Sequence, residues 1–74
     1  MDIFQTAIIA DKVIKVLLDG PKTAGQVLIL AGLHQSPELS EAMGALALAG
    51  LVTFDGQVYI LNQSKYKRLG GNPP

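Results

Sequence analysis

Hydrophobic positions near the start of the chain predict a helix over residues 2–18 that is apolar on most of its sides. One stripe follows the three-or-four spacing of a helix face, and its members are Ile3, Ala7, Ala10, Ile14 and Leu17. A second set widens that stripe: Phe4, Ile8, Val13, Val16 and Leu18. Such a helix either lies in the middle of a large core or packs against another chain.

A domain of this size has no large core with which to surround that helix. We therefore expect a homodimer, with an interface on this helix formed by Ile3, Phe4, Ile8, Ile9 and Val16. The alternative is a first helix held on two sides by its own domain.

Turn-forming and capping residues predict two more helices. Gly20 and the proline after it end the first helix, because glycine takes the left-handed conformation and proline cannot continue the hydrogen-bond ladder. Thr23 is a good N-cap for a second helix over residues 24–31. Ser36, followed by proline, begins a third helix over residues 37–49.

The rest of the chain predicts a β-hairpin and a short terminal turn of helix. Residues 51–54 and 57–61 carry β-prone side chains, and Asp55-Gly56 between them is a favoured pair for a type I′ turn. Residues 63–69 then begin a turn of helix. Residues 70–74, composed of glycine, asparagine and proline, form a flexible tail.

Three helices followed by a hairpin is the element order of a winged helix-turn-helix, an α+β fold. Residues 17–27 (LLDGPKTAGQV) resemble the opening of such domains, residues 46–52 (LALAGLV) the end of their third helix, and residues 55–61 (DGQVYIL) the wing. Over residues 12–61 the chain resembles the winged helix-turn-helix superfamily, as in small MarR- and ArsR-like regulators, without favouring one family. A bare three-helix bundle is the alternative, and it leaves the hairpin unexplained.

The resemblance implies a small DNA-binding transcriptional regulator, a homodimer whose third helix enters the major groove of double-stranded DNA. The candidate DNA contacts lie before and on the helices, on the wing and in the tail. They are Lys22, Thr23, Gln35, Ser36, Ser40, Glu41, Gln57, Lys65, Lys67 and Arg68.

Charge favours a different use of the same fold. No Lys or Arg occurs between Thr23 and Ser64, and the acids Glu38 and Glu41 repel phosphate. The formal net charge of zero divides into three Lys against six Asp and Glu in residues 1–61, and three cations against no acid in residues 62–74. The alternative is therefore a winged-helix module that binds another protein through its first or third helix. The common use of the fold places the DNA-binding regulator first.

Composition excludes several classes of protein and of binding site. A chain of 74 residues supports one domain, which we place over residues 1–69. The absence of cysteine excludes disulfides and thiolate metal sites, and a single histidine, His34, excludes a multi-histidine site. We expect no enzyme activity, no cofactor and no metal, because no nucleophile–base pair or phosphate loop is present. Without an apolar span of about 20 residues or a secretory leader, we expect a cytoplasmic protein with no membrane partner.

Overall fold

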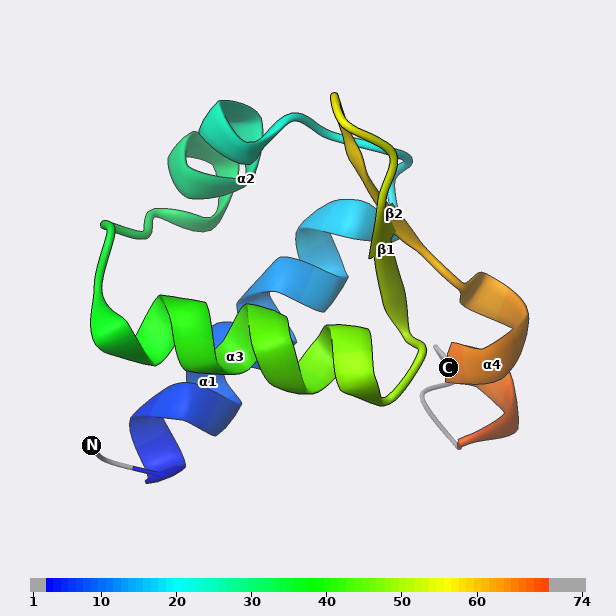
Figure 1. The fold of residues 1–74 in the computed structure, drawn as a ribbon, viewed down its shortest axis with the longest axis horizontal. Helices are drawn as coiled ribbons and strands as arrows, with labels where there is room; N and C mark the ends of the chain where they lie inside the picture. Colours follow the sequence, from blue (N-terminus) through cyan, green and yellow to red (C-terminus); the bar gives the residue numbers. More distant parts are fainter. Residues whose placement is uncertain (1–2, 70–74) are drawn as a thin grey trace.

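A computed structural model describes residues 3–69, and within them the chain forms four helices and one antiparallel β-hairpin (Figure 1). The elements are α1 (Ile3–Leu17), α2 (Ala24–Ala31), α3 (Pro37–Leu48), β1 (Val52–Phe54), β2 (Tyr59–Leu61) and α4 (Gln63–Arg68). This α+β arrangement confirms the three predicted helices and the hairpin, and α4 confirms the turn of helix expected over residues 63–69. The predicted tail over residues 70–74 lies outside the described residues.

The starts of α2 and α3 are fixed by hydrogen bonds from capping side chains. Thr23 Oγ1 accepts from the Gln26 backbone N–H at 3.2 Å, and Gln26 Oε1 accepts from the Thr23 N–H at 2.9 Å. This reciprocal pair is a capping box. Ser36 Oγ accepts from the Leu39 N–H at 3.1 Å, with Pro37 as the first residue of α3. These caps explain why the sequence places both helix starts correctly.

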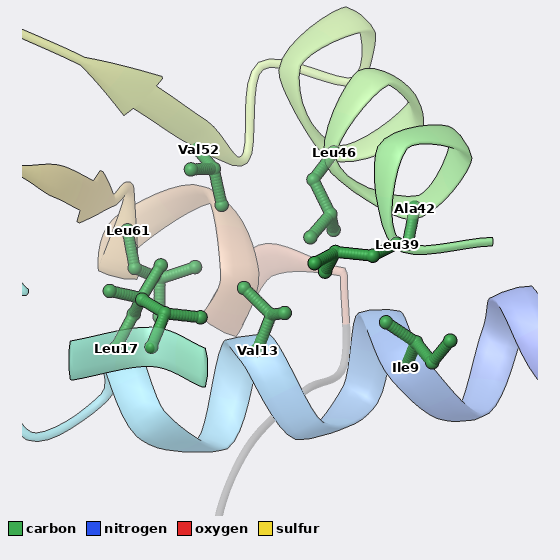
Figure 2. Close-up of a cluster of buried hydrophobic side chains, with 9 residues drawn as sticks. Ile9, Val13, Leu17, Leu39, Ala42, Leu46, Val52 and Leu61 are labelled. Carbon is green, nitrogen blue, oxygen red and sulfur yellow. The ribbon is translucent and has the colours of Figure 1, made fainter. Parts of the chain in front are cut away.

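The hydrophobic core lies between α1 and α3 and is closed at one end by the hairpin. Its buried members are Ile9, Val13, Leu17, Val27, Leu39, Ala42, Leu46, Val52 and Leu61. Figure 2 shows the side chains of α1 facing those of α3, with Val52 and Leu61 beside them. The members from α1 recur every fourth residue, which places them on one face of the helix.

This core corrects the prediction for part of α1. Ile9, expected in a dimer interface, is only 8% exposed and packs inside its own domain. Val16, expected in the same interface, is half-buried and packs against the core. The domain thus holds α1 on one broad side, and the residues left outside are nearer its N-terminal end. At the other helix, α3 ends at Leu48, one residue earlier than predicted, and Ala49 is exposed.

The hairpin pairs Val52 with Leu61 and Phe54 with Tyr59, but its turn differs from the prediction. Asp55 N–H donates to the Val58 carbonyl at 3.2 Å, so the two central residues are the intervening Gly56 and Gln57. Gly56 has a φ of 102°, whereas no residue other than glycine has positive φ among residues 3–69. A type I′ turn needs positive φ at both central positions. The predicted type I′ turn centred on Asp55-Gly56 is therefore wrong.

The segment between α1 and α2 runs against β2. Lys22 N–H donates to the Tyr59 carbonyl at 3.2 Å, and Tyr59 N–H donates to the Lys22 carbonyl at 2.7 Å. This short antiparallel bridge ties the start of α2 to the hairpin. It therefore fixes where Tyr59 lies relative to α2 and α3.

Helix α4 packs back onto the end of the hairpin and of α1. Asn62 Oδ1 accepts from the Lys65 N–H at 3.0 Å and begins the helix. Gln63 Nε2 donates to the Leu18 carbonyl at 3.4 Å, and Tyr66 packs against the core. Residues 62–69 are thus folded against the rest of the domain.

The α1–α3 core predicts a large difference between two leucine truncations. Leu17 is 1% exposed and Leu48 is 92% exposed, so the same change removes buried contacts at one site only. We expect Leu17→Ala to lower the free energy of unfolding by about 2–5 kcal/mol. Leu48→Ala should change it by less than about 0.5 kcal/mol. Urea denaturation followed by circular dichroism measures both, and equal losses would contradict this core.

Candidate functional site

The outward face of α3 carries small and apolar side chains and one carboxylate. Its exposed residues are Ser40, Glu41, Gly44, Ala45 and Leu48. Together with Pro37 they line a shallow hollow of about 470 Å³ along the helix. Small side chains here leave room for another molecule to approach the helix closely.

A second, smaller hollow lies where α2, α3 and β2 meet. Its volume is about 150 Å³, and its apolar lining comes from Ala24, Val27, Leu28, Leu39 and Met43. Gln35, Ser40 and Tyr59 add polar groups to the lining. Ser40 lines both hollows, so the two adjoin on α3.

An aromatic pair stands on the hairpin beside the smaller hollow. The rings of Phe54 and Tyr59 are 4.6 Å apart between centroids and tilted by 38°, a favourable geometry for two aromatic rings. Phe54 is exposed, and Tyr59 is half-buried with its ring against the core. Phe54 is not among the site residues predicted from the sequence, although cross-strand aromatic pairing in the predicted hairpin was a signal for it.

The position of the Lys22 side chain does not match its expected role as a contact to a DNA phosphate. Its side chain is only 15% exposed, and its Nζ donates to the Gly20 carbonyl at 3.3 Å and lies 3.8 Å from an Asp19 carboxylate oxygen. The ammonium group is therefore directed toward the turn between α1 and α2. A contact with a DNA phosphate would require this side chain to leave those partners.

The predicted DNA contacts other than Lys and Arg fall into two groups. Thr23 and Ser36 use their hydroxyl groups as helix caps. The side chains of Gln35, Ser40, Glu41 and Gln57 are exposed around α3 and the hairpin turn. These four provide polar groups but no positive charge.

The predicted cations of the tail lie on α4, which follows β2 at the end of the hairpin opposite its turn (Figure 1). Lys65 is half-buried, and its Nζ lies over Gly50, where an added Cβ would come within 2.9 Å of it. Lys67 and Arg68 are exposed. The structure thus separates these cations from the hairpin turn.

Exposed apolar residues gather at the N-terminal end of α1 and on α2. Ile3 is 77%, Phe4 76% and Ile8 50% exposed, which leaves them accessible on the outside of the domain. Ile29 and Leu30 on α2 are also exposed. The sequence analysis did not include these two residues, although the apolar composition of residues 24–31 was a signal that one small core cannot cover them all.

The carboxylate of Asp55 organises the hairpin turn. It accepts the backbone N–H groups of Gln57 and Val58, each at 2.9 Å. The hydrogen bond from Val58, followed by that from Gln57, lowers the pKa of the Asp55 carboxyl below its ordinary value.

Neither a metal site nor a membrane helix is found in the described part of the chain. Among residues 3–69, no three His, Asp or Glu side chains are grouped to hold a metal ion. None of the helices over the same residues has the length and apolarity needed to cross a membrane.

The sequence matches no protein-family model, and no curated protein or solved structure is significantly similar to it.

The Asp55 hydrogen bonds predict a pH-dependent hairpin turn. Because the pKa is lower in the folded chain, the stabilisation is present above the ordinary value of 3.8 and is lost as pH falls through the lower folded value. We expect the amide signals of Gln57 and Val58 to shift together in an NMR titration, with a midpoint below 3.8. Asp55→Ala should abolish this step, while the Val13 amide reports that the core stays folded. A midpoint at or above 3.8 would contradict the assignment.

Proposed function

We propose that this chain is a winged helix-turn-helix domain that binds a partner protein through α2, α3 and the hairpin. The order of three helices and a hairpin supports the fold. One observation carries the function: the only cation expected beside this face, Lys22, is directed toward the α1–α2 turn, and no Lys or Arg follows it until Lys65.

Electrostatics weighs against nucleic acid at this face. Neutralisation of phosphates by Lys and Arg supplies essentially all of the non-specific affinity for DNA. The segment from Thr23 to Ser64 carries Glu38, Glu41 and Asp55 and no Lys or Arg. A duplex approaching the outward face of α3 would therefore meet the Glu41 carboxylate and no Lys or Arg of that segment.

Surface chemistry favours a protein partner instead. Leu48 and Phe54 are exposed large hydrophobic residues on α3 and β1, and an apolar hollow lies between α2, α3 and β2. Protein interfaces combine such apolar and aromatic groups with a polar rim. Gln35, Ser40 and Glu41 supply polar groups around the same region.

DNA-binding regulation is a second candidate, supported by the exposed Lys67 and Arg68 on α4. In this alternative the tail supplies the phosphate contacts, and Gln35, Ser40 and Gln57 meet the bases or the backbone. A homodimer would double the number of these contacts.

A DNA titration separates the two functions. A DNA-binding protein typically has a non-specific Kd of roughly 10⁻⁴–10⁻⁶ M at physiological salt, and its affinity rises steeply as salt is lowered. We expect no binding of the full chain to a fluorescent duplex by anisotropy, even at low salt, because the α3 face lacks cations. Salt-dependent binding that is weakened by Lys67→Ala and Arg68→Ala would overturn our proposal and favour the regulator.

We also propose that a second copy of the chain covers the end of α1. Phe4 and Ile8 are exposed large apolar side chains one helical turn apart on the same face of α1, and the exposed Ile3 adds apolar surface beside Phe4. An exposed apolar patch can pack against the same patch of a second copy, as a two-fold symmetric contact requires. The exposed Ile29 on α2 adds to the apolar surface available to such a contact.

This interface predicts a change of oligomeric state. We expect sedimentation velocity at micromolar protein to give a dimer, and the double variant Ile3→Asp with Ile8→Asp to give a monomer, because it places charge in the apolar contact. Leu48→Asp is the control, since it introduces the same charge on α3 and should leave the dimer intact. A monomeric unmodified chain would refute this interface.

A further inference from the structure

We infer that the hollow between α2, α3 and β2 receives one apolar side chain of a partner protein, and that Lys or Arg lies next to that side chain in the partner. This inference rests on the proposed function and names the chemistry of the partner segment. It depends on the size of the hollow, on its lining and on the charge around it.

The size and lining of the hollow fit a single hydrophobic side chain. A volume of about 150 Å³ is similar to that of an engineered apolar cavity, in another protein, that holds one benzene molecule. Val27, Leu28, Leu39 and Met43 come from two helices and provide apolar contacts. A leucine-, methionine- or phenylalanine-sized group would thus exchange water for close packing on several sides.

Polar groups at the same place can bind the backbone that carries this side chain. Gln35 and Ser40 line the hollow and are exposed. Among residues 3–69, neither side chain is engaged in a hydrogen bond within the chain. An amide and a hydroxyl group beside an apolar hollow allow a partner segment to pair its own N–H and C=O groups while its side chain is buried.

The negative charge next to the hollow favours a partner segment that contains Lys or Arg. Ser40 also lines the hollow along α3, where Glu41 contributes its exposed carboxylate. Glu38 lines a different hollow, which it shares with Lys12 of α1, so Glu41 is the acid of α3 that this segment meets. A segment that runs from the anchor hollow along α3 therefore passes the exposed Glu41 carboxylate, which complements a Lys or Arg side chain.

The aromatic pair extends this complementarity on the hairpin side. Tyr59 lines the hollow, and the exposed ring of Phe54 lies 4.6 Å from it between centroids. Aromatic faces attract Lys and Arg side chains, most strongly where water is excluded. The acidic helix and the aromatic strand thus both favour a cation beside the apolar anchor.

A random peptide library displayed on phage tests this inference with the full chain as bait. We expect the selected peptides to share one Leu, Met or Phe beside Lys or Arg. Ala24→Leu fills the hollow from α2 and should weaken a selected peptide roughly ten- to a hundredfold, the effect of losing one buried apolar side chain. Ala47→Leu is the matched control, because it makes the same change at an exposed position of α3 that lines neither hollow.

A second pair of variants tests whether peptide binding requires the negative charge on α3. Glu41→Lys should weaken the same peptides, whereas Asp19→Lys, on the turn after α1, should not. Circular dichroism of each variant confirms that it is folded before binding is compared.

The other possible results contradict either the anchor site or the proposed function. Selected peptides without the apolar-and-basic pattern, or equal effects of Ala24→Leu and Ala47→Leu, overturn the anchor site and leave protein binding in place. A failure to select any peptide above background also overturns the anchor site. Salt-dependent binding of duplex DNA in the separate titration overturns the proposed function itself.

Discussion

Packing of α3 against α1 is the contact on which the rest of the molecule depends. The buried side of α3 faces α1 and consists of Leu39, Ala42 and Leu46. Because a helix is rigid, the orientation of this side also sets which residues face outward. The fully buried Ala42 leaves space for close approach of the two helices where a larger residue would separate them. Residues on the opposite side of α3, including Glu41 and Leu48, are consequently held outward. The chemistry of the exposed face thus follows from the periodicity of the core.

The second constraint is the pairing of Lys22 with Tyr59, which joins segments far apart in the sequence. It holds β2 beside the start of α2, and Tyr59 therefore lies where α2 and α3 meet. The same pairing accounts for the position of the Lys22 side chain, because its backbone is fixed at the bridge and its ammonium group reaches the Gly20 carbonyl. A residue that looks like a free phosphate ligand in the sequence is thus part of the turn that supports the hairpin.

Local signals in the sequence predict the helices and the hairpin well. The candidate site depends on tertiary contacts, which the sequence does not reveal directly. The range of α2 is correct because Thr23 and Gly32 mark its two ends by side-chain and backbone chemistry. The turn was misassigned because Asp55 acts through its carboxylate as the first residue of the turn, which a preference for Asp-Gly pairs does not reveal. Ile9 was assigned to the surface because a helix that is apolar on most sides does not show which side its own domain will cover. The hollow beside Tyr59 was not predictable, since it exists only where three distant segments meet.

The balance of apolar and charged groups explains why large apolar side chains remain on the surface of this small chain. A chain of this length buries a smaller share of its surface than a larger domain does, and nearly half of its residues are hydrophobic. Large apolar side chains therefore remain outside on α1, α2 and α3, including Ile3, Ile29 and Leu48. The net charge of zero conceals a similar division, because the acids of α3 and the cations of α4 belong to separate elements. Neutrality of the whole chain thus coexists with acids on α3 and cations on α4, and the net charge alone does not describe the surface of either helix.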